Sequence, residues 1–377
     1  MTYTVLAQPY SQPQGHQKSK IPSVQFVFSA HKVARIDAKV DKGRMIGYVT
    51  SDTQPPAAAD LVKAGYTHII VAFGVFSTKV PGVVVSGFRH VDQLYINSLQ
   101  AAGIKVLLAL GGSGTIIPNT TTNFDQALSL AANTEVFTET FISSLDILRA
   151  QYGFDGFDFN IKDGLIGRGD FANPAGDIAV VAHIIRTLRD QYPDMLLTLT
   201  PQMENISATQ GFDSIWGNYA SLVMKTASAL NWVGIQLYDS GCCFGIDAVC
   251  YGLDNLTSSA VYVAMVTDLL ENWPDKDSAG QATGFQPYFS YLNPSQVVLG
   301  ISLKGTNDAN TAGMLASKVK RALQCLRTGD SSCEGYTPPR TYPNIGGVFE
   351  WELSYEQANN YLFTQALHAC ITKGSCG

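Results

Sequence analysis

The stretch Gly153-Phe154-Asp155-Gly156-Phe157-Asp158-Phe159-Asn160-Ile161-Lys162 decides how the rest of the chain is interpreted. Its second half alternates strictly between apolar and polar side chains, which predicts a β-strand with one apolar and one polar face. The apolar face is Phe157, Phe159 and Ile161, and the polar face is Asp158, Asn160 and Lys162. A solvated strand face is the ordinary explanation of such a row. In a closed parallel barrel, however, the row would point inward at the end of the strand where catalytic groups lie.

Strand and helix patterns alternate from Met45 to the end of the chain, which favours the barrel. Near-continuous apolar runs are typical of parallel strands that are buried on both faces. Besides the stretch quoted above, the predicted strands are residues 45–49, 68–73, 106–110, 195–201, 232–238, 297–301 and 347–351. The predicted helices include residues 91–102, a helix that ends at Gly153, residues 178–190 and residues 355–368.

This order predicts an α/β fold, a (β/α)8 or TIM barrel, formed as a single domain by residues 44–377. Residues 1–43 are interpreted as a short N-terminal extension packed on the outside. A doubly wound sheet is the structural alternative, but no Gly-x-Gly-x-x-Gly fingerprint follows the first strand.

Composition excludes several classes of function. The net charge of −6 argues against a nucleic-acid partner, because phosphates require basic surfaces. No apolar run approaches the roughly 18 residues of a membrane span. The first nine residues lack the basic start and apolar core of an ordinary signal peptide.

Seven cysteines fall into three short-range groups, which suits local disulfides with one thiol left over. We expect Cys325 to pair with Cys333, Cys370 with Cys376, and Cys250 with either Cys242 or Cys243. A zinc site is the alternative, but it lacks a Cys-x-x-Cys pair or clustered histidines. The grouping favours a secreted or extracytoplasmic protein.

The quoted stretch resembles the fourth-strand signature of family 18 glycoside hydrolases, the chitinases and endo-N-acetylglucosaminidases. That signature reads Asp-Gly-x-Asp-x-Asp-x-Glu. Asp155, Gly156 and Asp158 match it, whereas Asn160 replaces the third Asp and Lys162 replaces the Glu. In the family, the Glu protonates the glycosidic oxygen and the Asp before it orients the acetamido group that attacks the anomeric carbon. A lysine beside Asp158 keeps its proton at neutral pH, so the resemblance implies a degenerate motif without its proton donor.

The resemblance extends to other strand ends and implies a set of ligand-binding residues. These are Tyr48, Gln202, Gln236, Tyr238, Asp239 and Trp351, of which Trp351 would form the floor of the central sugar site and Tyr238 would bind the acetamido carbonyl. Ala109-Leu110-Gly111-Gly112 lacks the serine that the family places in its third strand. We further expect Asp155, Asp158 and Lys162 to share the inward face, with Lys162 paired to one of the two carboxylates. A barrel top in which Trp351 and Tyr48 only fill space is the competing interpretation.

Three functions follow from this pattern. The leading hypothesis is a catalytically inactive chitinase-like protein without a cofactor, which binds an N-acetylglucosamine-containing glycan or a protein partner. The second is an active glycosidase with a relocated acid, for which Asp163, Glu204 and Asp239 are the candidates. The third is a structural or toxin-complex component in which the barrel is a scaffold, since a fold does not determine a function.

Overall fold

The computed structural model describes residues 43–50, 54–113, 117–162, 164–165, 176–206, 218–247, 249–253, 258–271, 292–306 and 308–376. The extension predicted for residues 1–43 lies outside these ranges except for Gly43. Asp163, one of the candidate relocated acids, also lies outside the described residues.

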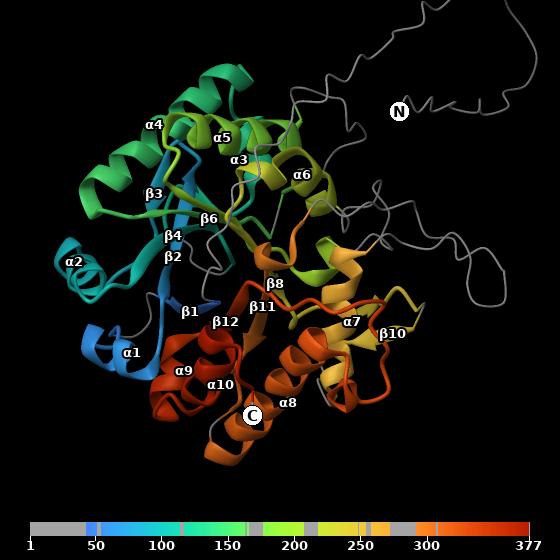
Figure 1. Ribbon diagram of the computed structural model, residues 1–377. Helices are drawn as coiled ribbons and strands as arrows, with labels where there is room; N and C mark the ends of the chain where they lie inside the picture. The colour runs from blue at the N-terminus through green and yellow to red at the C-terminus, as the bar shows by residue number, and fades with distance from the viewer. Residues whose placement is uncertain are drawn as a thin grey trace, which may run out of the picture. The chain divides into compact units, whose positions relative to one another are not determined.

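Eight parallel strands close into a barrel, as the alternation of strands and helices predicted (Figure 1). Their order around the barrel is β1, β2, β4, β6, β7, β8, β11 and β12, and β12 pairs with β1 to close the ring. Their bounds are β1 Arg44–Val49, β2 His68–Ser77, β4 Lys105–Gly111, β6 Gly156–Asn160, β7 Leu196–Leu199, β8 Trp232–Gln236, β11 Val297–Ser302 and β12 Gly347–Trp351. The predicted TIM barrel is confirmed.

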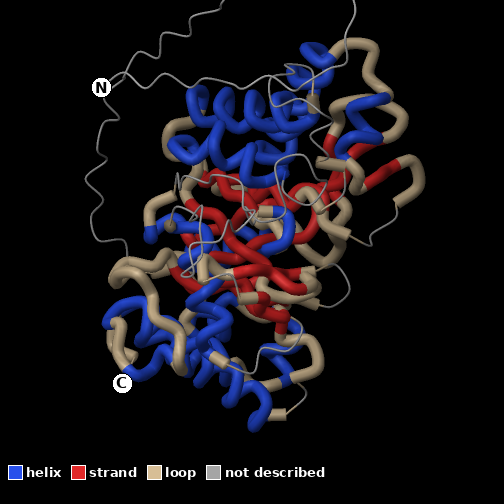
Figure 2. Tube along the Cα trace, turned by 90° about the vertical axis from the view of Figure 1, so that its right-hand side faces the viewer, coloured by secondary structure: helices blue, strands red, loops and turns tan. Residues whose placement is uncertain are grey.

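Helices surround these strands, as the blue coils around the red core show in Figure 2. They are α1 Ala58–Ala64, α2 Gln93–Ala101, α3 Phe124–Ser129, α4 Thr134–Tyr152, α5 Asp177–Gln191, α6 Asn218–Thr226, α7 Ser259–Leu270, α8 Ala309–Thr328, α9 Leu353–Ala358 and α10 Leu362–Lys373. No described helix is both long and apolar enough to cross a bilayer.

Two small antiparallel additions were not predicted from the sequence. β3 Val84–Ser86 and β5 Thr120–Thr121 extend the sheet beside β2. β9 Cys242–Phe244 and β10 Cys250–Gly252 form a separate hairpin after β8. The helix predicted for residues 355–368 is two helices, because Asn360 and Tyr361 adopt left-handed backbone angles between α9 and α10.

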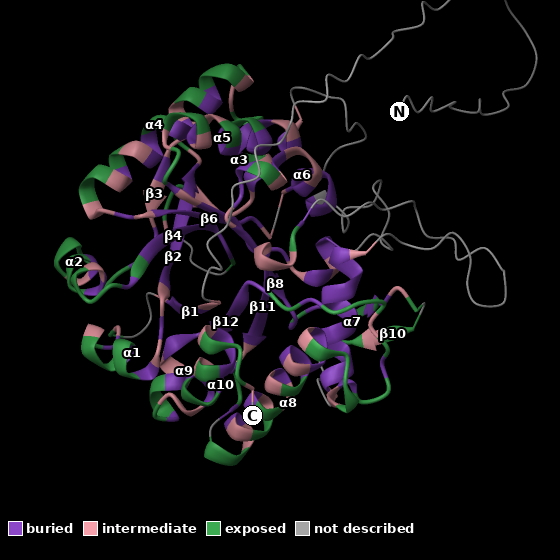
Figure 3. Cartoon of the chain, viewed as in Figure 1, coloured by how far each residue is buried: buried purple, intermediate pink, exposed green. Residues whose placement is uncertain are grey.

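The register of β6 sets the direction of its side chains. Phe157, Phe159 and Ile161 belong to the apolar layer shared with the helices. A second buried cluster fills the inside of the barrel and includes Tyr48, Phe73, Tyr238 and Phe349. Figure 3 shows that the barrel strands are mostly buried along their length. Asp158 and Asn160 face this interior, because side chains alternate along a strand.

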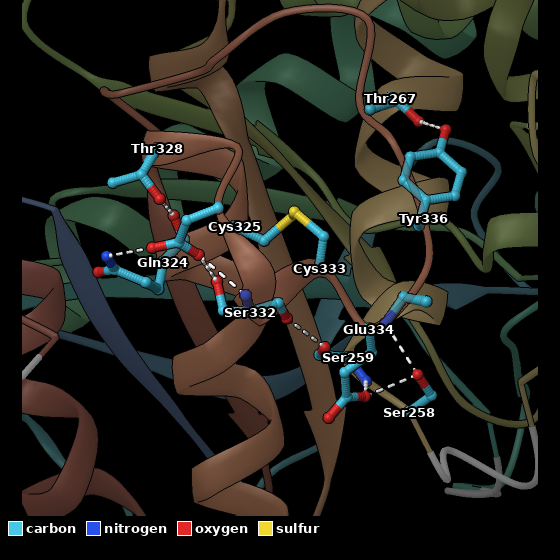
Figure 4. Close-up of a disulfide and its surroundings, with 12 residues drawn as sticks. Ser258, Ser259, Thr267, Gln324, Cys325, Thr328, Ser332, Cys333, Glu334 and Tyr336 are labelled. Carbon is cyan, nitrogen blue, oxygen red and sulfur yellow. Dashed lines mark hydrogen bonds between the residues drawn. A yellow bond between two sulfur atoms is a disulfide. The ribbon is translucent and has the colours of Figure 1, made fainter.

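The disulfide predictions are confirmed, and the choice left open for Cys250 is settled. Cys325 is joined to Cys333, Cys370 to Cys376 and Cys242 to Cys250, while Cys243 is a buried free thiol. Figure 4 shows the Cys325–Cys333 bond tying the end of α8 to the turn that follows it. From that turn, Glu334 accepts hydrogen bonds from the hydroxyl of Ser258 and the backbone nitrogen of Ser259 at the start of α7.

Candidate active site

Asp158 is the carboxylate at the centre of the barrel end, and three hydroxyl groups hold it. Thr198 of β7 and Thr200, directly after β7, each donate to its Oδ1 at 2.6 Å, and Tyr48 of β1 donates to its Oδ2 at 2.9 Å. The side chain of Asp158 is fully buried. Both oxygens are therefore occupied by donors, as a buried carboxylate requires.

Burial and hydrogen bonding act on Asp158 in opposite directions. Burial raises the pKa of its carboxyl group, and the hydroxyls of Thr198, Thr200 and Tyr48 oppose this rise by stabilising the charged form. Burial and the nearby Asp158 raise the pKa of Tyr48 well above its usual value, so its phenol remains a hydrogen-bond donor.

Asn160 lies two residues further along β6 and forms an amide pair with Gln236 of β8. Gln236 Nε2 lies 3.2 Å from Asn160 Oδ1 and 2.8 Å from the backbone oxygen of Thr200. Both amide side chains are buried. The pair connects β6 to β8 across the end of β7.

Three aromatic rings, those of Tyr48, Phe73 and Trp351, pack against one another inside the barrel. Phe73 stacks on Trp351 with the ring centroids 5.8 Å apart, and Tyr48 approaches the same indole at 5.6 Å. Trp351 stays partly exposed, whereas Tyr48 is only 1% exposed. Gly112 makes room for Phe73, since a Cβ at this left-handed position would lie 2.5 Å from the Phe73 ring.

Gln202, Glu204 and Asp239 lie together at the rim beyond β7 and β8. Gln202 Nε2 donates to the backbone oxygen of Asp239 at 2.7 Å. The carboxylate of Glu204 lies 3.4 Å from the backbone nitrogen of Gly241. Asp239 is exposed, and its backbone is left-handed with φ 48. Two of the three candidate relocated acids are thus neighbours on one side of the barrel mouth.

The expectation that Asp155 shares the inward face with Asp158 and Lys162 is wrong. Asp155 precedes β6, at the opposite end of the barrel, where it forms an ion pair of 2.8 Å with Lys105. It also accepts from Gln100 and from the backbone nitrogen of Val106. Lys162 lies seven residues on, roughly 23 Å for an extended chain, so Asp155 cannot be its partner.

The expected pairing of Lys162 with Asp158 is also corrected. The hydrogen bonds to the Asp158 carboxylate come from hydroxyl groups, not from an ammonium group. Lys162 follows the end of β6 and is half-buried. The buried carboxylate of Asp158 is therefore stabilised by the hydroxyl groups of Thr198, Thr200 and Tyr48.

Sequence reasoning missed Thr198, Thr200 and Phe73. The two threonines alternate with Leu197 and Leu199, so the period-two pattern that identified β6 would have placed them on the inner face of β7. Ala109 and Thr198 flank Asp158 on the neighbouring strands. Ala109 of β4 cannot donate a hydrogen bond to Asp158, and Thr198 on the opposite neighbouring strand, β7, supplies that donor. Phe73 gave no such signal, because residues 69–76 of its strand are all apolar or glycine.

A surface groove lies away from the ends of the barrel strands. A groove of about 710 Å³ lies between α4 and α5 and is lined by their side chains, among them Glu135, Glu139, Asp146 and His183. None of its lining residues comes from the end of a barrel strand. Within the described ranges, no group of three or more His, Cys, Asp or Glu residues could hold a metal ion.

Comparison with known proteins agrees with this geometry. The family profile described as Glycosyl hydrolases family 18 matches residues 44–352. Exochitinase 1 of Streptomyces olivaceoviridis is 26% identical over 283 residues, which are 71% of this chain and 43% of that protein. A probable class II chitinase of Arthroderma benhamiae is 25% identical over 71% of this chain and 77% of its own length. The chain thus spans less than half of the first relative.

Solved structures give the same result. The Legionella pneumophila ChiA C-terminal domain is 51% identical, with a TM-score of 0.82 over 89% of this chain and all of that domain. A family GH18 chitinase from Chromobacterium violaceum is 22% identical, with a TM-score of 0.67 over 88% of this chain and 83% of that one, and shares the fold. With a family profile covering the barrel from β1 to β12, this chain belongs to glycoside hydrolase family 18.

Proposed function

We propose that this chain is a non-hydrolysing member of the family, which binds glycans containing β-1,4-linked N-acetylglucosamine at the mouth of its barrel. One observation carries the proposal: the β6 row retains a single carboxylate, Asp158, which is fully buried beneath three hydroxyl donors. Lys162 stands where the resemblance requires the acid. No carboxyl group of this row is therefore available to protonate a glycosidic oxygen, a step that contributes roughly 10²–10⁴-fold to catalysis.

The groups suited to holding a sugar are retained. Trp351 is partly exposed and is held in place by Phe73 and Tyr48, so its indole offers an apolar face to the C–H side of a pyranose ring. The hydroxyl of Tyr238 forms no hydrogen bond with any described residue, and it suits an acetamido carbonyl. Tyr48 is too deeply buried to contact a ligand, so its role is to support Asp158.

The ligand class and the location follow from further observations. The relatives carry the name chitinase, which supports chitin-type glycans as ligands in preference to a protein held by the barrel loops. Three disulfides favour an oxidising, extracytoplasmic environment. A scaffold role would need neither the partly exposed Trp351 nor an unpaired Tyr238 hydroxyl.

A working hydrolase with a relocated acid is the second candidate. It is favoured by the positions of Glu204 and Asp239, since the Glu204 carboxylate lies 3.4 Å from the backbone nitrogen of Gly241, two residues after Asp239 at the rim of the mouth. This function requires hydrolysis of a glycan that depends on one of these two side chains. Glycan binding without hydrolysis would favour the first candidate over this one.

The deciding experiment measures chitin-bead binding and the release of a fluorophore from a chitobioside on the same preparation. We expect binding and no release above background. Trp351→Ala should abolish binding, whereas Leu94→Ala, at an exposed position of α2, is the matched control and should bind normally. Release that disappears in Glu204→Gln or Asp239→Asn would establish the hydrolase instead.

A further inference from the structure

Arg327 is a half-buried cation that contacts a disulfide instead of a carboxylate. It lies in the last turn of α8, which packs beside α10 (Figure 1). Its Nη1 lies 3.1 Å from Cys370 Sγ and 2.7 Å from Cys376 Sγ. Within the described part of the chain, the guanidinium donates to these two sulfurs alone and forms no ion pair. Burial lowers the pKa of Arg327, and no nearby carboxylate opposes this.

A disulfide is a poor partner for this cation, because its sulfur atoms are neutral and accept hydrogen bonds only weakly. A thiolate is a much better partner, since an adjacent arginine lowers the pKa of a cysteine thiol by stabilising the charged form. Reduction of the Cys370–Cys376 bond would therefore supply the anion that Arg327 lacks. Stabilising the reduced form makes a disulfide easier to reduce, and a lower thiol pKa makes each cysteine a better leaving group.

The other two disulfides have no such cation at their sulfurs. No side chain of the described residues donates to a sulfur of Cys242–Cys250 or Cys325–Cys333. Arg321, which precedes the second of these bonds on α8, forms an ion pair of 2.8 Å with Glu334. Its charge is thus already balanced by a carboxylate, and it gains nothing from the appearance of a thiolate.

The two sulfurs beside Arg327 differ in their access to solvent. Cys370 is fully buried on α10, whereas Cys376 is partly exposed beyond the end of that helix. We infer that the Cys370–Cys376 bond is an exchangeable disulfide at which a small thiol, such as glutathione, adds to Cys376, and that Arg327 controls its reactivity.

The exchange proceeds in two balanced steps. The thiolate of one glutathione forms a bond to Cys376 Sγ, the Cys370–Cys376 bond breaks, and its electron pair stays on Cys370 as a thiolate beside Arg327. A second glutathione thiolate then attacks the sulfur of the first, which releases Cys376 as a thiolate beside the same guanidinium. One protein disulfide is reduced and two glutathiones become glutathione disulfide, while the protons that they lose pass to the buffer or to the new cysteine thiolates.

Equilibration of the full chain in glutathione buffers of graded redox potential tests the inference. Acid quenching, alkylation and peptide mass spectrometry then report each disulfide separately. We expect Cys370–Cys376 to be reduced in buffers that leave the other two bonds largely oxidised, with the glutathione adduct on Cys376. Arg327→Gln should lower the equilibrium constant for its reduction about tenfold or more, the ratio that one hydrogen bond to a charged group supports. Arg321→Gln, the same change on the same helix, is the matched control and should not.

The pH dependence of alkylation separates an electrostatic role of Arg327 from a merely structural one. In the reduced protein, iodoacetamide should react with Cys376 with an apparent pKa below about 8.5, the ordinary value of a thiol. The apparent pKa should rise in Arg327→Gln and stay low in Arg327→Lys, which retains the charge. Lys373, the exposed cation in the last turn of α10, is present in every variant and cancels.

The wild-type measurement decides the inference even where a variant does not fold, which thermal unfolding verifies. Reduction of all three disulfides at one redox potential, or of Cys370–Cys376 last, overturns it. An unchanged equilibrium constant in folded Arg327→Gln removes Arg327 as the determinant and contradicts it as well.

Discussion

Thr200, directly after β7, donates a 2.6 Å hydrogen bond to the carboxylate of Asp158 on β6, and the Tyr48 hydroxyl lies 3.0 Å from the same threonine hydroxyl. The three side chains form one buried network, which Thr198 completes. This network retains a carboxylate in the barrel although Ala109 offers it no donor. Asp158 is thereby held inside the barrel by hydroxyl groups from two neighbouring segments.

Thr200→Val should destabilise the fold, because it removes a donor from a buried carboxylate while preserving the shape of the side chain. A hydrogen bond to a charged group contributes about 1.5–3 kcal/mol, and we expect a loss of that order in the free energy of unfolding. Denaturant titration at neutral pH measures it. Thr337→Val, at an exposed position, is the control and should change stability little. Equal stabilities of the two variants would contradict the network.

Gly112→Ala should damage the sugar site through Phe73. The new Cβ would lie 2.5 Å from the Phe73 ring, so the ring must move away from Trp351. We expect weaker glycan binding together with a loss of stability above the roughly 1 kcal/mol of left-handed strain.

Gly103→Ala is the matched control for this change. Gly103 has a similar left-handed backbone, with φ +84, but a Cβ there would meet nothing within 4 Å. The strain should cost stability without affecting binding. Identical binding by both variants would show that Phe73 does not position Trp351.

Glu350 predicts a pH dependence of stability. It is fully buried on β12, Tyr66 donates to its Oε1 at 3.0 Å, and its Oε2 has no partner among the described residues. Burial, then the nearby Glu356, raises the pKa of Glu350 well above its usual value. A raised carboxyl pKa contributes stability that is fully present below about pH 4.5, the unfolded value, and is lost as pH rises through the folded pKa.

Glu350→Gln isolates this contribution. The wild type should lose stability relative to the variant as pH rises above about 4.5, at up to about 1.4 kcal/mol per pH unit. His68, whose burial lowers its pKa to about 3, has the opposite effect but is present in both proteins and cancels. Denaturant titrations from pH 4 to 8 in steps of about one unit give the free energy of unfolding of both proteins. Glu139→Gln, at an exposed position, is the control and should show the same pH dependence as the wild type. The same pH dependence for Glu350→Gln and the wild type would refute the prediction.

Cys243 should be chemically inert in the folded protein. It is fully buried, and burial, followed by Asp268 and Glu204, raises the pKa of its thiol to about 12. The thiolate is the reactive form, so alkylation should be negligible until the chain is unfolded. Thiol titration should find none in the native protein and one in denaturant. More than one thiol without reductant would contradict the disulfide assignment.

The barrel was predictable from the sequence because its strands combine apolar runs with regular spacing, and β6 carries a strict period-two pattern. That alternation also placed Asp158 and Asn160 inside the barrel. Gly153 was expected to end the preceding helix, and it does so with φ 86. These features depend on local steric preferences and on the alternation of apolar and polar residues, and both can be recognised within a single segment of the sequence.

The errors concern contacts between segments. Asp155 has the wrong parity to share the face of Asp158, and its partner Lys105 lies on another strand. The break between α9 and α10 depends on Glu356, which accepts hydrogen bonds from the backbone nitrogens of Phe363 and Thr364 at the start of α10. The carboxylate caps a helix in place of a local N-cap side chain, and no pattern within the helix reveals this.

The central claim is that the barrel mouth binds chito-oligosaccharides and does not cleave them. The most direct test titrates chitohexaose into the wild-type protein in a calorimeter and then analyses the contents of the cell by mass spectrometry after prolonged incubation. The account predicts saturable binding that Trp351→Ala abolishes, with intact hexasaccharide recovered. Shorter oligosaccharides that form with the wild type, and fail to form with Glu204→Gln or Asp239→Asn, would contradict it.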